Sequence, residues 1–160
     1  MNSRVYLRTP ALDDKSAIEN AYERSQALHH PWIFAPVNIG QYLQQPCRYL
    51  VCDAESAAIL GTFHISSIVR GCFQSAYLGF EAFLPYANQG FMSQGLQLLL
   101  NQAFTVLKLH RLEANIQPEN INSKKLVSKL GFVQEGYSKQ YLNVGGLGWK
   151  DHERWAIVAG

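Results

Sequence analysis

The segment from Gly90 to Lys108 constrains the fold most, because its apolar side chains recur at helical spacing along its whole length. The apolar positions are Phe91, Met92, Leu96, Leu99, Leu100, Ala103, Phe104 and Leu107. Together they form a wide apolar stripe on one side of a helix. The stripe therefore predicts a long amphipathic helix over residues 90–108.

Strand-like segments lie on both sides of this helix. Three consecutive segments before it predict an antiparallel meander over Arg48–Ala54, Ala58–Val69 and Phe73–Phe83. After it come a strand over His110–Gln117, a helix over Glu119–Leu130 that Gly131 closes, and a final hairpin over Phe132–Leu142 and Trp149–Val158. The strand–helix–strand unit in the second half of the chain's order of elements is expected to run parallel.

The first part of the chain predicts one strand, two helices and a loop. The strand covers Ser3–Arg8, and a helix that Asp13 or Asp14 caps runs to about Leu28. A loop from His29 to Pro36 and a short helix over Asn38–Gln44 follow. The complete order, βααβββαβαββ, is typical of an α+β fold.

Composition limits the class of protein. A chain of 160 residues suits one compact domain, so we expect residues 1–160 to form a single domain. The formal net charge of +2 makes nucleic acid a poor partner. The chain start has no apolar signal region, and the apolar stretches fall short of the roughly 20 residues of a membrane helix. We therefore expect a cytoplasmic protein that does not bind a membrane.

The cysteines predict neither disulfides nor a metal site. Cys47, Cys52 and Cys72 are odd in number, form no CxxC pair and have a spacing that suits no zinc site. We expect all three to be reduced and mostly buried.

Two helix starts are candidates for binding chemistry. The loop Leu84–Met92 leads from a strand through Gly90 into the long helix, where free N–H groups and the helix dipole can accept a phosphate or pyrophosphate. Asn120–Ser123 lies at the start of the next helix. Each candidate also has a plainer interpretation, an ordinary turn at Gly90 and ordinary helix caps at Asn120 and Ser123. Together they can line one end of a split sheet, where an extended phosphate-bearing ligand fits.

Several motifs, in this order, resemble the GNAT family of N-acetyltransferases. The motifs are Leu7–Pro10, His30–Trp32, Asn88–Met92, His110–Ala114, Pro118–Ser123, Lys129–Tyr137, Tyr141–Leu142 and Gly148–His152. The resemblance covers nearly the whole chain and is strongest to the branch that acetylates ribosomal-protein alanines. It implies a mixed, mostly antiparallel sheet that splays in the middle and carries helices on both faces.

The resemblance also implies acetyl-CoA as cosubstrate, and no metal. In the family, the strand before the glycine loop pairs its backbone with pantetheine, which here points to Ala82, Phe83 and Leu84. The pyrophosphate rests on loop amides, here those of Asn88, Gln89, Gly90, Phe91 and Met92. The Asn120 position supports the cofactor, and the Ser123 position lies near the sulfur.

This sequence departs from the family at several of these positions. Ala87 stands where the loop usually begins with Gln or Arg, and Met92 stands where Gly or Ala is common. A tyrosine that donates a proton to the departing thiolate in another branch is replaced by Val127, so Ser123 is our candidate acid, with helix capping as its plainer role.

The general base is the least determined of the catalytic groups. Asn115 and Gln140 stand where relatives carry a carboxylate, and neither side chain can take up a proton, although Asn115 can hold a water. Glu81, on the strand beside the expected cofactor site, is a further candidate, and its plainer interpretation is an outward-facing surface carboxylate.

The absence of an obvious carboxylate base favours an easily deprotonated acceptor. At pH 7, deprotonating an α-amine costs roughly 1 kcal/mol, and deprotonating a lysine costs roughly 4.6 kcal/mol. We therefore expect a protein N-terminal α-amine as acceptor, attacked directly in a ternary complex by a monomer or homodimer. A small-molecule amine as acceptor, and a non-catalytic acyl-CoA-binding module, stay open as alternatives.

Overall fold

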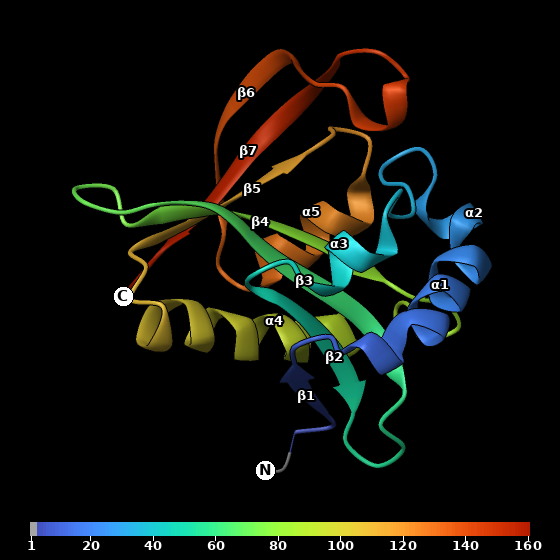
Figure 1. Cartoon of the computed structure of the whole chain (residues 1–160). Helices are drawn as coiled ribbons and strands as arrows, with labels where there is room; N and C mark the ends of the chain where they lie inside the picture. Colours follow the sequence, from blue (N-terminus) through green and yellow to red (C-terminus); the bar gives the residue numbers. More distant parts are fainter. Residues whose placement is uncertain (1–2) are drawn as a thin grey trace. The chain divides into compact units, whose positions relative to one another are not determined.

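The computed structural model describes residues 3–160 (Figure 1). Within that range seven strands form one mixed sheet in the order β1-β2-β3-β4-β5-β7-β6. The chain divides into two compact units, and β3 and β4 contribute residues to both of them. The first unit comprises the residues up to His64 and Phe80–Leu99, and the second comprises Ile65–Gly79 and Leu100–Gly160.

The first unit pairs antiparallel strands beside short helices. β2 (Arg48–Asp53) pairs with β1 (Val5–Arg8) on one side and with β3 (Ile59–Val69) on the other. The helices are α1 (Lys15–Arg24), α2 (Gln26–His29), α3 (Ile39–Leu43) and most of α4 (Phe91–Asn101). Their shared core with the strands consists of Ile18, Ala21, Tyr22, Tyr42, Leu43, Leu50, Cys52, Ile59 and Phe83.

Glycines let α4 and β4 approach β3 and β2 closely. A Cβ on Gly95 of α4 would lie 3.1 Å from side-chain atoms of Val51 and Phe63. A Cβ on Gly61 of β3 would collide with the sulfur of Met92 and lie 2.7 Å from the carbonyl oxygen of Glu81. Met92 therefore packs over Gly61.

The predicted first helix is interrupted, and its cap is different from the expectation. The segment forms a short 3₁₀ turn (Leu12–Asp14), α1 and α2, with a break at Ser25. Neither expected capping carboxylate caps α1. Instead, Asp14 accepts hydrogen bonds from the Arg8 guanidinium at 2.7 Å and from the N–H of Ala11 at 2.8 Å. A charged bidentate partner outcompetes the helix start for this carboxylate.

The second unit contains the parallel pair and the final hairpin. β4 (Ser75–Ala82) pairs parallel with β5 (Arg111–Ile116), as predicted, but only from Ser75–Tyr77 to Arg111–Glu113. Past these three pairs both strands continue outside the shared ladder, which is the expected splay. β7 (Lys150–Val158) pairs antiparallel with β5 and with β6 (Val133–Leu142), and these three strands lie side by side in Figure 1.

The remaining helices and turns of this unit lie where the sequence predicts them, but their ends and helix types differ from the prediction. α5 (Ile121–Lys129) ends before Gly131, whose φ of +99° confirms the predicted left-handed residue after the helix. The hairpin loop contains a 3₁₀ turn at Val144–Gly146. The long predicted helix is α-helical only to Asn101, and residues Gln102–Val106 form π-helical turns.

The expectation of mostly buried cysteines is correct for one of the three. Cys52 is buried, Cys47 is half-buried and Cys72 is exposed, and all three are free thiols. Cys72 lies in the turn before β4, outside any core. Within residues 3–160, no helix is both long and apolar enough to cross a bilayer.

Candidate active site

The loop before α4 presents main-chain groups to solvent. Asn88 and Gly90 have φ values of +60° and +84°, so the chain turns sharply here, and residues 88–90 are exposed. The side chain of Gln89 donates to the carbonyl of Pro85 at 2.8 Å and fixes the loop. Since the first N–H groups of a helix have no partner inside that helix, the start of α4 at Phe91 can donate to an anion.

Arg4 adds a positive side chain to this loop. Its Nη2 donates to the carbonyl of Gln89 at 3.0 Å, and its guanidinium lies 4.5 Å from the centre of the Phe91 ring. The same Nη2 would lie 3.1 Å from a Cβ on Gly90. A cation at the positive end of a helix dipole is unfavourable by itself and becomes favourable when an anion binds between them. The sequence did not indicate Arg4, because nothing local links this residue, just before β1, to a loop more than 80 positions away.

The end of β4 is fixed by side chains from α1 and α2. His29 Nε2 bonds to the carbonyl of Ala82 at 2.7 Å. The hydroxyl of Ser25 accepts from the N–H of Leu84 at 3.0 Å, and Arg24 donates to the carbonyl of Leu84. The N–H of Phe83 donates to the carbonyl of Leu60 at 2.9 Å. These groups of residues 82–84 are therefore already engaged, and a ligand would have to use others.

Backbone alternation indicates which groups those are. Phe83 bonds toward β3, and successive residues of a strand direct their backbone groups to opposite edges. Phe80 and Ala82 therefore direct theirs away from β3, and the ladder with β5 has ended at Tyr77. The N–H of Ala82 and both backbone groups of Phe80 lie along this edge.

Glu81 is mostly buried, so its interpretation as an outward-facing carboxylate is wrong. Its side chain is 16% exposed, and its Oε2 is inaccessible and has no hydrogen-bond partner among the described residues. Arg48 Nη1 lies 3.9 Å from that oxygen. Burial raises the pKa of Glu81 to about 7, against the opposing effect of the Arg48 charge. The carboxyl is thus poised near neutral pH, as a general base requires.

Two tyrosines, from α1 and α3, lie near enough to this carboxylate to interact with its charge. The hydroxyl of Tyr22 donates to that of Tyr42 at 3.1 Å, and both rings are buried. Burial raises the pKa of each phenol, so both stay neutral. The sequence identified Glu81 but missed Arg48, Tyr22 and Tyr42, whose spacing is that of ordinary core residues.

In the second unit, Asn120 caps α5. Its side-chain oxygen accepts from the N–H of Ser123 at 3.4 Å, which is the plainer role considered for this asparagine. Ser123 itself is half-buried in the first turn. Val127 is fully buried, so the family position it occupies offers no donor in this chain. Gln140 is exposed, and its N–H donates to Asp151 at 2.8 Å.

Asn115, on β5, has an unsatisfied acceptor. Its amide donates weakly to Glu113 at 3.4 Å, whereas its buried Oδ1 has no hydrogen-bond partner among the described residues. Glu113 is held by Arg111, which also pairs with Glu135 at 2.8 Å. A buried acceptor without a protein donor suits a bound water, the role expected for this residue.

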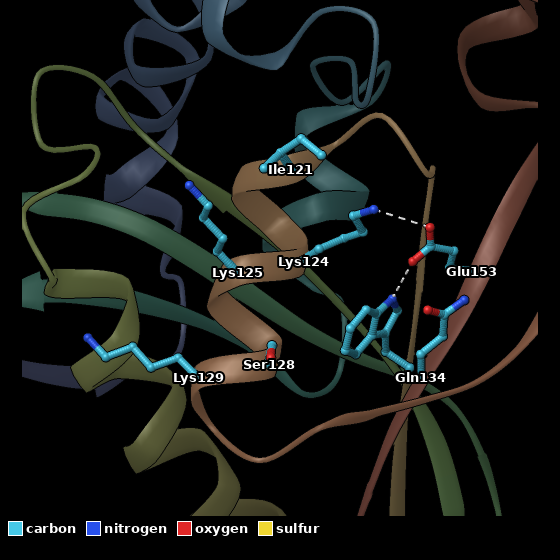
Figure 2. Close-up of a pocket in the computed structure, with 8 residues that line it drawn as sticks. Ile121, Lys124, Lys125, Ser128, Lys129, Gln134 and Glu153 are labelled. Atoms are coloured by element: carbon cyan, nitrogen blue, oxygen red, sulfur yellow. Dashed lines mark hydrogen bonds and ion pairs between the residues drawn. The ribbon is translucent and has the colours of Figure 1, made fainter.

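A hollow of about 520 Å³ lies beside α5, β6 and β7 (Figure 2). Its lining residues are Ile121, Lys124, Lys125, Ser128, Lys129, Gln134, Glu153 and Trp155. Glu153 accepts from Lys124 at 3.2 Å and from the indole of Trp155 at 3.1 Å. The hollow is lined by neither Asn120 nor Ser123, so it is not the site that the sequence predicts. Among residues 3–160, no cluster of His, Cys, Asp or Glu is arranged to hold a metal ion.

Comparison with known proteins gives one family. The family model for an acetyltransferase (GNAT) domain matches residues 4–133. The [ribosomal protein uS5]-alanine N-acetyltransferase of Escherichia coli (strain K12) is 35% identical over 106 residues, which are 66% of this chain and 54% of that protein. The chain spans little more than half the length of the related sequences it matches.

Two solved structures share the fold over nearly the whole chain. The ribosomal-protein-S5-alanine acetyltransferase of Vibrio fischeri has a TM-score of 0.85 at 27% identity, with 99% of this chain and 94% of that chain covered. RimJ of Mycobacterium smegmatis, solved in complex with CoA-disulfide, has a TM-score of 0.85 at 25% identity, with 97% and 82% covered.

Proposed function

Because this chain belongs to the GNAT acetyltransferase family, we propose that it transfers an acetyl group from acetyl-CoA to a primary amine. Residues 1–160 act in this proposal as one acetyltransferase domain in the cytoplasm, as a monomer or homodimer. The observation that carries the proposal is Glu81, a buried carboxylate with a pKa near 7 on the strand that leads to the Gly90 loop.

The residues of the first unit fit the two ends of acetyl-CoA. The main-chain amides of residues 88–92, of which residues 88–90 are exposed, and the guanidinium of Arg4 would bind the pyrophosphate. Main-chain amides bind phosphate whatever side chain they carry, and Arg4 supplies the cation that Ala87 does not. The solved CoA complex of the related RimJ supports CoA as the ligand.

Pantetheine would pair with the backbone of β4, two residues earlier along the strand than the family motif suggests. The family places this contact at Ala82, Phe83 and Leu84, but several of their backbone groups are engaged by Ser25, His29 and Leu60. We therefore assign the pairing to Phe80 and to the N–H of Ala82. The family resemblance also assigns Asn120 and Ser123, at the start of α5, to the cofactor.

Each step of the transfer has a residue in this proposal. Acetyl-CoA supplies the acetyl thioester, whose carbonyl carbon the amine nitrogen attacks. Glu81, directly or through a water, accepts the proton that the amine loses. A backbone N–H of β4 stabilises the negative charge on the carbonyl oxygen. Ser123 donates a proton to the departing thiolate, and Asn115 holds a water beside β5.

A protein N-terminus is the acceptor that suits this base best. A carboxylate with a pKa near 7 matches an α-amine, whose pKa is about 8, far better than a lysine, whose pKa is about 10.4. The similarity to enzymes named for ribosomal-protein alanine points to the same acceptor class.

A screen of acceptor peptides with acetyl-CoA, read by mass spectrometry, tests the proposal. We expect acetylation of peptides with a free N-terminus, with higher kcat/KM than for N-blocked peptides that carry lysine. Glu81→Gln should lower turnover about 10²- to 10⁴-fold while CoA affinity is retained. Greater efficiency on lysine would overturn the acceptor assignment. CoA binding without transfer to any peptide or small amine would instead indicate a non-catalytic module.

A further inference from the structure

Arg48 is a buried cation for which the proposed reaction has no role so far. It begins β2, its side chain is only 8% exposed, and its guanidinium lies 4.1 Å from the centre of the Tyr42 ring. Since removing a cation from water is unfavourable unless it is compensated, the groups around Arg48 should explain its position.

The groups that hold Arg48 in place are neutral. Its Nε donates to Gln45 Oε1 at 2.9 Å, and its Nη1 donates to the hydroxyl of Thr62 at 3.2 Å. The hydroxyl of Thr62 in turn donates to the carbonyl of Tyr49 at 2.9 Å, so the anchor is itself fixed. These bonds define where the guanidinium lies without neutralising its charge.

The carboxylate that faces Arg48 is held just beyond contact. The distance of 3.9 Å from Nη1 to Glu81 Oε2 exceeds the 2.7–2.9 Å of a closed charged hydrogen bond. A buried ion pair stabilises a protein only when close contact between its charges offsets the cost of removing them from water. The Arg48–Glu81 pair lacks such close contact. Arg48 therefore acts on Glu81 through its charge and leaves Oε2 without a hydrogen bond.

The other titratable groups around the pair are uncharged near neutral pH. Tyr22 faces it from α1 and Tyr42 from α3, and burial raises the pKa of both phenols. His64, on β3, also feels Arg48, and burial lowers its pKa to about 4. Among the described residues, Arg48 is thus the charged group that faces Glu81 from the elements packed around it.

We propose that Arg48 is a positioning residue: its charge, anchored by Gln45 and Thr62, sets the pH at which Glu81 gives up its proton and can act as the base. This inference rests on the proposed function, in which Glu81 accepts the proton of the amine. Without the Arg48 charge, burial alone would keep Glu81 protonated at neutral pH and unable to accept that proton.

Two variants test this by direct titration of Glu81. Arg48→Met removes the charge, and Gln45→Glu retains Arg48 but places a competing carboxylate on it. The pKa of Glu81 is measured by ¹³C NMR of its side-chain carboxyl. Both variants should raise this pKa, and Arg48→Met should raise it by about 1 to 3 pH units. The acidic limb of the kcat/KM profile should move in the same direction. Arg48→Lys retains the charge and should restore most of the wild-type titration.

Arg70→Met, a change in an exposed turn, is the matched control and should move neither readout. Should Arg48→Met fail to fold, Gln45→Glu decides the question. The inference is overturned when folded variants titrate Glu81 like the wild type, or when the titration moves and the kcat/KM profile does not. The NMR titration needs no acetyl-CoA, so it measures the effect of Arg48 on Glu81 even if the wild type is inactive. An inactive wild type would refute the proposed function alone.

Discussion

Replacing Glu81 with glutamine should stabilise the protein, and the gain should grow with pH. The folded state raises the pKa of this carboxyl from its ordinary value of 4.5 to about 7. Below pH 4.5 the carboxyl is protonated in both states and imposes no penalty. Between the two values the unfolded chain releases the proton and the folded chain retains it, so folding becomes less favourable as pH rises.

The size of the effect follows from these two pKa values. A difference of about 2.5 corresponds to about 3 kcal/mol of stability that the ionised wild type lacks above pH 7. Glutamine is nearly isosteric and neutral, so it escapes this penalty. Between pH 5 and pH 8, the advantage of Glu81→Gln over the wild type should grow by about 2.5 kcal/mol. At this chain length that is about 5 to 10 °C in Tm.

Urea unfolding at pH 5, 6, 7 and 8 measures this difference, with Glu19→Gln, an exposed helix carboxylate, as the control. The control should show no such growth with pH. If the difference in unfolding free energy between Glu81→Gln and the wild type stays constant across the pH series, the pKa of Glu81 is not raised by folding. That result would refute our choice of base. A gain in stability together with lost turnover is the signature of a group retained for function.

Three further variants test the remaining site residues. Ser123→Ala should lower kcat with little change in CoA affinity, and an unchanged rate by stopped flow would eliminate its role as acid. Gly90→Glu should abolish CoA binding in calorimetry, because φ is +84° and a carboxylate would oppose the pyrophosphate; retained binding would contradict the loop assignment. Arg4→Ala should weaken CoA about tenfold. That difference should shrink in 0.5 M salt, whereas a salt-independent loss would argue against a phosphate contact.

Hydrophobic periodicity was sufficient to place the strands and helices of this chain. The strands of the meander, the parallel strand after the long helix and the turn at Gly131 were all found as predicted. Local patterns were less informative at element ends, where long-range partners decide. Asp14 binds Arg8 instead of capping α1, and the long helix widens into π turns after Asn101.

The surroundings of the candidate base could not be predicted in this way. Strand alternation gives the face on which Glu81 lies but not what covers that face. The neighbours of Glu81 include Tyr22 and Tyr42, which are about 60 and 40 positions away in the sequence, respectively, and look like core residues there. Arg48 reads as an ordinary strand-end charge. A pKa near 7 is a property of this assembled cluster, and no segment of the sequence carries it alone.

The short ladder between β4 and β5 has a consequence for how this chain tolerates change. Tyr77, the last β4 residue paired to β5, is followed four residues later by Glu81, and side chains of a strand alternate between faces. One residue inserted between them would invert Glu81 while the paired end of the strand stayed in place. Two inserted residues would restore its face and displace the Gly90 loop instead. Variants of this sequence that remain functional should therefore carry insertions and deletions only outside residues 77–81.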